Sequence, residues 1–240
     1  MNEKTVSEAI SHRRSVRVYD PEKPIDTAIV KQCIQQATLA PTSSNLQLWE
    51  FYHITDIELK EKIAKNCFNQ PAARTALELV IPVVRLDLWK KRIQSNVDFI
   101  QNVDPEIMDS KSKKGALSYY QKILPKLYAG QSPLRGFFAK LFTRLRGNSK
   151  VTYREVGSGD LRVVAHKSTA LAAQNFMTSM AAFGYDTCPM EGFDSVRLKK
   201  ILGLTDAAQI SMVIGCGIRK EEGVYGERFR IPFEEVYREF

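Results

Sequence analysis

The chain has 240 residues, of which 44% are hydrophobic and 26% are charged, and its formal net charge is +8. This composition is ordinary for a folded globular protein and excludes a disordered or low-complexity chain. No apolar run approaches the roughly 20 residues that a membrane-spanning helix needs. The N-terminal sequence MNEKTVSEAI has no signal-peptide core, so we expect a cytoplasmic protein.

Helix and strand signals alternate along the first half of the chain. Thr5 and Glu8 form a capping box that opens a short helix. Asp26 caps a second helix, in which apolar residues recur at helical spacing up to Ala37. Three further elements are expected, a strand over 49–54, a helix over 56–66 and a strand over 79–86. Pro82 predicts that the last of these strands lies at a sheet edge or carries a bulge.

The same alternation continues in the second half of the chain. We expect helices over 167–183, 194–202 and 233–240, and a buried strand over 210–218. Gly157 and Gly159, in the sequence GSGD, predict a turn. The order of elements predicts one layered α/β or α+β domain over 1–240. A basic, helical insertion at about 111–154 interrupts it, and we call this range the basic segment.

Several common kinds of site are absent from the sequence. The four cysteines are widely spaced and form no CxxC pair, so we expect buried, reduced thiols and no metal site. No GxGxxG follows a strand and no GxxxxGK[ST] occurs, which argues against a Rossmann dinucleotide site and a P-loop. The sequence also lacks the motifs of the common hydrolases.

Four short motifs carry the chemistry that remains. They are RRSVR (13–17), the polar loop APTSSNLQLW (40–49), CPMEGF (188–193), expected as a turn, and ERFRIP (227–232). Guanidinium groups suit phosphate, and the two arginine groups would share one phosphate if the chain ends meet. The motifs offer cations, hydroxyls and amides but almost no proton-transfer group. This is typical of a site in which a bound cofactor carries the chemistry.

In this order and at these distances, the four motifs resemble the FMN-dependent nitroreductase family, over about residues 5–95 and 160–240. The resemblance implies an α+β fold with a central, mostly antiparallel sheet flanked by helices. It also implies an intertwined homodimer with two FMN sites at the subunit interface. NADH or NADPH would give hydride to FMN, and a nitroaromatic, a quinone or a related small-molecule acceptor would then take the electrons in a ping-pong scheme.

The resemblance also implies a role for individual residues. The FMN phosphate would be held by Arg13, Arg14, Ser15, Arg228 and Arg230. Arg17 would lie near the N1 and O2 edge of the flavin, and Asn69 would bond its pyrimidine side. The partner subunit would supply Pro41, Thr42 and Ser43, in a loop shaped by Asn45 and Gln47. The ring would pack on Pro189, Met190, Glu191 and Gly192, and no side chain would act as a catalytic residue because FMN carries the chemistry.

The motifs depart from the family pattern at a few positions. Thr42 replaces a serine and keeps its hydroxyl, whereas Leu48 replaces a proline. Ala72 stands where a basic residue is common, and Arg74 is a candidate substitute. The basic segment is the largest departure, and it favours a second hypothesis, a flavoenzyme of the same fold with a dedicated physiological substrate.

The basic segment holds 11 of the 35 Lys and Arg residues and none of the acidic residues. Within it, residues 134–145 form an amphipathic pattern with a basic polar face, which is typical of helices that lie on anionic membranes. A lid or dimer-arm helix shows the same periodicity, and we favour that interpretation over membrane contact. A membrane- or anion-binding protein that acts through this helix remains a third hypothesis. Nucleic-acid binding is not expected, because aromatic residues are not interleaved with the cations.

Overall fold

The computed structural model describes residues 3–129 and 132–240. Its strands are β1 (Trp49–Ile54), β2 (Glu78–Val84), β3 (Asp186–Met190), β4 (Gln209–Ile210) and β5 (Val213–Gly217). Its α-helices are α1 (Val6–His12), α2 (Thr27–Ala37), α3 (Ile57–Asn66), α4 (Pro71–Arg74), α5 (Trp89–Asn102), α6 (Ser110–Ser118), α7 (Leu124–Tyr128), α8 (Pro133–Arg146), α9 (Ser158–Ala182), α10 (Ser195–Ile201) and α11 (Phe233–Val236). Shorter turns are the 3-10 helices η1 (Ser43–Asn45), η2 (Leu86–Leu88) and η5 (Glu221–Gly223), and the π-helical η3 (Tyr119–Ile123).

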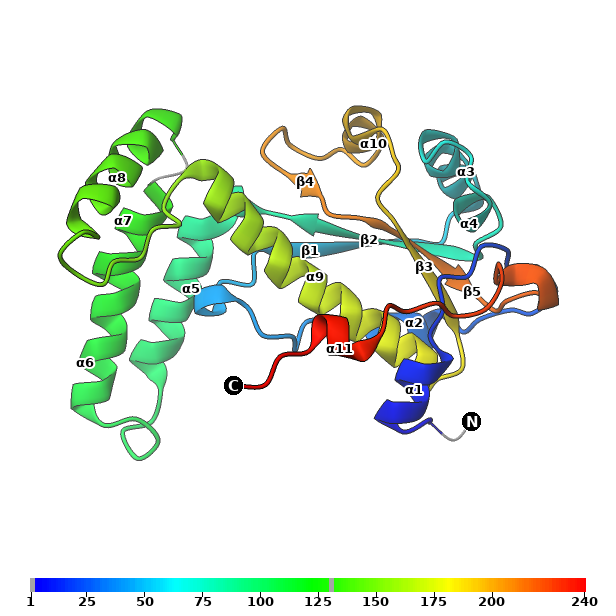
Figure 1. The fold of residues 1–240 in the computed structure, drawn as a ribbon, viewed down its shortest axis with the longest axis horizontal. Helices are drawn as coiled ribbons and strands as arrows, with labels where there is room; N and C mark the ends of the chain where they lie inside the picture. The colour runs from blue at the N-terminus through cyan, green and yellow to red at the C-terminus, as the bar shows by residue number, and fades with distance from the viewer. Residues whose placement is uncertain (1–2, 130–131) are drawn as a thin grey trace.

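An antiparallel sheet with helices on both faces forms the centre of the fold (Figure 1). The strands run in the order β1-β2-β5-β3, and β4 also pairs with β2. Each of these pairs is antiparallel. The expected α+β architecture with an antiparallel sheet flanked by helices is therefore confirmed.

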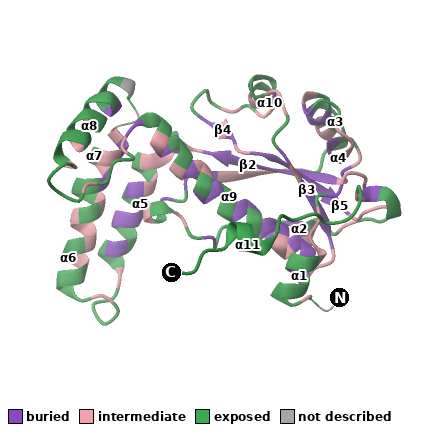
Figure 2. Cartoon of the chain, viewed as in Figure 1, coloured by how far each residue is buried: buried purple, intermediate pink, exposed green. Residues whose placement is uncertain are grey.

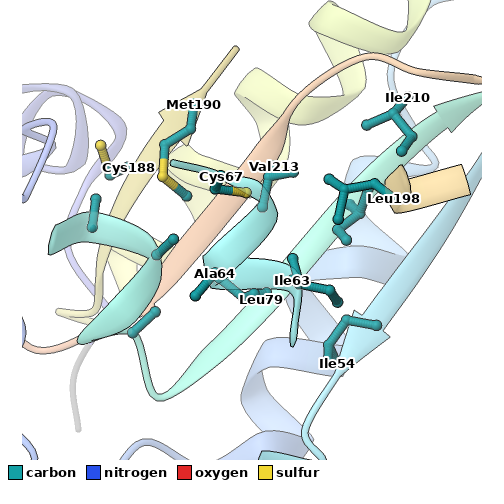
Figure 3. Packing of buried hydrophobic residues seen from close by; sticks show 14 of the residues in the cluster. Ile54, Ile63, Ala64, Cys67, Leu79, Cys188, Met190, Leu198, Ile210 and Val213 are labelled. Carbon is teal, nitrogen blue, oxygen red and sulfur yellow. The ribbon is translucent and has the colours of Figure 1, made fainter. Parts of the chain in front are cut away.

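Alternation along β2 divides the core into two layers. Leu79, Ile81 and Val83 pack with α3, α4 and α10 on one face of the sheet, as the close view of this cluster illustrates (Figure 3). Val80 points to the other face, where α2 and α9 supply Val30 and Phe176 among other buried residues. Because β2 is buried on both faces, its sequence is almost continuously apolar.

Pro82 lies in a central strand, so the expectation of a sheet edge is wrong, while the expected bulge is present. Val83 pairs with Ile210, but Val80 pairs with Ile214, so the partner side contains one extra residue. This bulge divides the strand expected over 210–218 into β4 and β5. A proline is tolerated here because the ladder is already interrupted opposite it.

Four other expectations are corrected by the structure. Cys188 to Met190 form the end of strand β3 rather than a turn, because they pair with β5. Helix α9 begins at Ser158, nine residues before the expected start. The GSGD sequence is therefore the start of a helix and not a turn, since Asp160 accepts a hydrogen bond from the Gly157 N–H at 3.0 Å. The tail expected as a helix over 233–240 is helical only in α11.

The basic segment forms α6, η3, α7 and α8, which extend from α5 at one end of the molecule (Figure 1). Its buried residues Leu124 and Tyr128 join a third core cluster, together with Leu46 from the loop before β1 and Ile93 of α5. Within the described ranges, no helix is both long enough and apolar enough to span a bilayer.

Substituting Gly215 tests how closely β5 approaches its neighbours. A Cβ at Gly215 would lie 2.5 Å from the backbone oxygen of Ala72 and 3.2 Å from Tyr19 Oη. We expect Gly215→Ala to lower the free energy of unfolding by about 1–3 kcal/mol in urea denaturation, because a backbone atom must move. Gly159→Ala is the matched control, since no atom lies within 4 Å of its added Cβ. Equal stability of the two variants would contradict the close packing at Gly215.

Candidate functional site

The two ends of the chain meet at one polar cavity of about 270 Å³. It is lined by Arg13, Arg14, Ser15, Arg17, Val224, Tyr225, Glu227, Arg228, Phe229 and Arg230. We call it the arginine pocket. The structure thus brings together all six residues for which the resemblance implied contact with the FMN phosphate or with the nearby ring edge.

Side chains of the arginine pocket link its two segments, one near the N-terminus and one near the C-terminus, by hydrogen bonds. Arg228 Nη2 donates to the carbonyl oxygens of Ser11 at 2.7 Å and Arg13 at 2.8 Å. In the opposite direction, Arg14 Nη2 donates to the carbonyl oxygen of Gly226 at 3.0 Å. The two bonds of Arg228 satisfy carbonyls around the C-terminal end of α1, where cations are favoured. Arg14 and Arg228 therefore hold the two segments of the pocket together and also contribute to its positive charge.

A glycine lets the C-terminal tail approach the first motif closely. The backbone N–H of Arg17 donates to the Gly223 carbonyl oxygen at 2.7 Å. A Cβ at Gly223 would overlap the carbonyl oxygen of Val18. A larger residue would push the tail away, so this close approach depends on glycine.

Several cations lie close together in the arginine pocket. Burial lowers the pKa of Arg13, and the neighbouring Arg228 and Arg230 lower it further. The Arg13 guanidinium nevertheless stays protonated at neutral pH. A bound phosphate would accept paired hydrogen bonds from the same groups.

A buried ion pair that the sequence analysis missed supports the first motif. Asp186 is 3% exposed and accepts from the Arg219 backbone N–H at 2.8 Å and from Arg219 Nε at 2.9 Å. Arg219 Nη2 also donates to the His12 carbonyl oxygen at 3.0 Å, directly before Arg13. Asp186 is the first residue of β3, which the sequence did not predict as a strand, so no local signal pointed to this pair.

The third motif, CPMEGF, and the loop containing Asn69 meet beside the first motif. An isolated parallel bridge joins Ser15 to Thr187, which places the first motif along β3. Gln70 Nε2 donates to the Gly192 carbonyl oxygen at 2.8 Å, which brings the loop containing Asn69 to the end of β3. Pro189 and Met190 therefore end a strand whose neighbours include the arginine pocket. Gln70 was not among the expected site residues.

Cys188 lies between these motifs but is not a reactive thiol. It is fully buried, and burial raises its pKa, while Arg17 and Arg13 act in the opposite direction. A thiol with a raised pKa is a poor nucleophile at neutral pH. All four cysteines of the chain are buried and unpaired.

The loop with Pro41, Thr42 and Ser43 lies elsewhere in the same chain, beside α5 and far from the arginine pocket (Figure 1). It lines a separate cavity of about 430 Å³ with Tyr153 and Lys167. The Ser43 N–H donates to Ser168 Oγ of α9 at 3.3 Å. One chain therefore does not place this loop against its own arginine pocket.

Buried amides fix the shape of this loop. Asn96 of α5 is 8% exposed, donates to the Asn45 carbonyl oxygen at 3.0 Å and accepts from Asn45 Nδ2 at 3.0 Å. Gln47 Nε2 donates to Asn45 Oδ1 at 3.2 Å. Leu48, the departure from the family proline, is buried in the adjacent core cluster. Asn96 is a further residue that the sequence did not predict as part of the site.

Backbone strain gathers in two of the predicted site loops. Among the described residues, the non-glycine positions with positive φ are Ser44, Asn45, Gln47, Phe68 and Asn69. Such conformations cost of order 1–3 kcal/mol each and persist where surrounding structure holds them. Their confinement to the loops at 41–47 and 68–69 makes both loops candidate parts of the site.

Glu191 faces a further cavity of about 580 Å³, which it lines with His166 and Lys167 of α9. Lys167 also lines the cavity of the loop at 41–43, so it joins the two regions.

Asn69 and Arg74 line one smaller cavity, which leaves Arg74 available for the basic role that Ala72 does not fill.

A family model described as the nitroreductase family matches residues 10–218. The chain belongs to the nitroreductase family. A Staphylococcus haemolyticus protein named "Putative NAD(P)H nitroreductase" is 26% identical over 240 residues, with 98% of this chain and 96% of that protein covered. Like this relative, many members of the family carry oxidoreductase names, and the present chain is an oxidoreductase of that family.

Two solved structures share the nitroreductase fold with this chain. A Staphylococcus epidermidis protein described as a "putative NAD(P)H:FMN oxidoreductase" has a TM-score of 0.75 at 24% identity, with 100% of this chain and 97% of that chain covered. A "putative nitroreductase in complex with FMN" from Exiguobacterium sibiricum has a TM-score of 0.71 at 20% identity, with coverages of 100% and 99%. The fold is therefore shared over nearly the whole length of each chain.

Asn96→Leu tests whether the buried amide holds the loop at 41–47. Loss of its two hydrogen bonds with Asn45 should speed hydrogen exchange of the loop amides by about tenfold or more, since each such loss costs about 1–3 kcal/mol. Asn102→Leu, on the same helix, is the control, because Asn102 is exposed and bonds only to Asp98. Exchange as slow as in the unmodified protein would show that Asn96 does not support the loop.

Proposed function

We propose that this nitroreductase-family protein is an FMN-dependent oxidoreductase. It takes hydride from NADH or NADPH and then reduces a small-molecule acceptor, such as a nitroaromatic or a quinone, in a ping-pong scheme. The observation that carries the proposal is the arginine pocket, in which cations from both chain ends surround one cavity. The family membership and the FMN-bound fold neighbour give further support.

The residues of the arginine pocket fit the phosphate of FMN. Arg14 and Arg228 already donate to backbone carbonyls, so they shape the pocket. Arg13, Ser15 and Arg230 then supply donors to the phosphate oxygens. The positive charge around Arg13 favours a doubly charged ligand.

The neighbouring motifs would bind the ring. Arg17 supplies a fixed cation near N1 and O2, which stabilises negative charge there, and Asn69 bonds the pyrimidine side. Pro189, Met190, Glu191 and Gly192 form the floor, with a backbone N–H near N5. When bound, FMN supplies the hydride and electron transfer, while these residues bind and orient it.

A homodimer completes this site in the proposal. Pro41, Thr42 and Ser43 lie far from the arginine pocket of their own chain, in a loop that Asn45 and Gln47 shape. We propose that this loop contacts the flavin of the partner subunit, so that the dimer holds two FMN sites. The four buried, unpaired thiols suit a reducing compartment, and we propose the cytoplasm as the place of action.

Removing two of the phosphate donors tests the cofactor assignment. We expect Arg13→Ala combined with Arg230→Ala to weaken FMN binding by about a hundredfold or more, because two charge-assisted interactions are lost. The visible spectrum of the purified protein and a fluorescence titration with FMN measure the change. Arg197→Ala combined with Arg238→Ala removes the same charge from exposed positions outside the pocket and should retain FMN. Full flavin retention in the pocket variant contradicts the assignment.

A second candidate is a flavoenzyme with a dedicated substrate, for which nitro reduction is incidental. The observation in its favour is Tyr153, which brings the basic segment into the cavity of the loop at 41–43. If the loop at 41–43 contacts the flavin, part of the cavity next to the flavin is formed by the basic segment.

A panel of acceptors separates the two candidates. With NADPH or NADH as donor, turnover of nitroaromatics or quinones above about 1 s⁻¹ supports general acceptor reduction, since typical enzymes work at or above this rate. Bleaching of the flavin by NAD(P)H with slow turnover of every nitroaromatic and quinone supports a dedicated substrate. The absence of any bleaching would contradict both.

A further inference from the structure

Helix α8 exposes its large apolar side chains rather than burying them. Six of them recur at spacings of three and four residues and so share one face, namely Leu134, Phe137, Phe138, Leu141, Phe142 and Leu145. Each is between 47% and 68% exposed. Figure 2 shows α8 in the colour of exposed residues along almost its whole length.

The face of α8 that turns toward the rest of the protein consists of small residues. Gly136 is buried, and Ala139 and Thr143 are half-buried. On this side of the helix Lys140 Nζ lies 2.9 Å from Asp160 Oδ2, at the N-terminus of α9. The contacts hold α8 by its polar side, so most of its apolar face points away from the protein, which is the reverse of an ordinary surface helix. Phe142, at the edge of this face, also lines a cavity of about 490 Å³ with Ile123 and Tyr153.

An apolar face of this kind calls for a covering surface. A helix of 14 residues is marginal by itself in water, and a contiguous cluster of exposed aromatic and aliphatic side chains marks an interaction site. The expected lid, with its apolar face docked on the active site, does not form within one chain, and the expected dimer arm stays a prediction.

Charge identifies what covers this face. At 100° per residue, Arg135 and Arg146 flank the apolar face on one side and Arg144 flanks it on the other. The basic segment holds 11 Lys and Arg and no acidic residue, so a covering surface with negative charge complements it. The same segment of a second copy carries only positive charge and would repel it.

We propose that α8 is a docking helix for an anionic lipid bilayer. Its six apolar side chains enter the boundary between headgroups and acyl chains, and the flanking arginines contact the anionic headgroups. The protein then lies on the membrane surface, anchored by α8 without a spanning segment. This inference does not depend on the proposed flavin chemistry.

Sedimentation with lipid vesicles tests the proposal on the full chain. The unmodified protein should sediment with vesicles that contain phosphatidylglycerol and remain in solution with vesicles of phosphatidylcholine alone. Phe138→Asp combined with Leu141→Asp should weaken this binding by about a hundredfold or more, because apolar insertion is lost. Both residues are exposed, so the variant should retain the circular dichroism spectrum and melting temperature of the unmodified protein.

A pair of charge variants tests the arginines separately. Arg135→Ser combined with Arg146→Ser should weaken binding to phosphatidylglycerol vesicles by about tenfold or more, since each basic residue near such a surface contributes about 1 kcal/mol. Lys31→Ser combined with Lys65→Ser removes the same charge from exposed positions on α2 and α3 and should change binding much less.

Three results would overturn the docking proposal. One is failure of the unmodified protein to sediment with anionic vesicles. Another is unchanged vesicle binding by the Phe138→Asp, Leu141→Asp variant. The third is a fall in the molar mass of that variant by light scattering, because a second copy of the chain would then be the surface that covers α8.

Discussion

The arginine pocket depends on a set of hydrogen bonds that hold like charges together. Arg228 and Arg14 each bind backbone carbonyls across the two ends of the chain, and Asp186 holds Arg219 against the carbonyl before Arg13. These contacts offset the repulsion that would otherwise separate the two motifs. The close approach at Gly223 adds a steric condition to the electrostatic one. Hydrogen bonds to backbone carbonyls therefore bring the two arginine motifs together, and this proximity gives the pocket its positive charge.

The other parts of the candidate site are the two loops with positive φ values, at 41–47 and 68–69. The positive φ values at Asn45 and Asn69 belong to two different loops. The buried Asn96 holds the first loop, and a hydrogen bond from Gln70 to Gly192 holds the second. In one chain these loops stand on different sides of the molecule. In the proposed dimer both loops contact one flavin, which gives a reason for the strain in each of them.

The basic segment combines two kinds of packing. Leu124 and Tyr128 join the core near α5, so the segment is part of the folded body. Helix α8 instead contacts that body through Gly136, Ala139 and the Lys140–Asp160 ion pair. The periodicity of α8 was visible in the sequence, but periodicity does not tell which face meets the protein, and the structure reverses the usual answer.

Local signals in the sequence determined a layered α/β or α+β domain, the helix caps and the motif identities, because caps and periodicity act within a few residues. The resemblance to the nitroreductase family then implied the α+β class. Strand β1 and the capping box of Thr5 and Glu8 appear as expected. Tertiary structure decided the central position of Pro82 and the strand that contains Cys188, since both depend on partners more than 20 residues away. It also decided that Arg13 and Arg230 share a pocket and that α8 faces outward. Long-range pairing and the direction of an amphipathic face leave no local pattern, and only the folded chain fixes them.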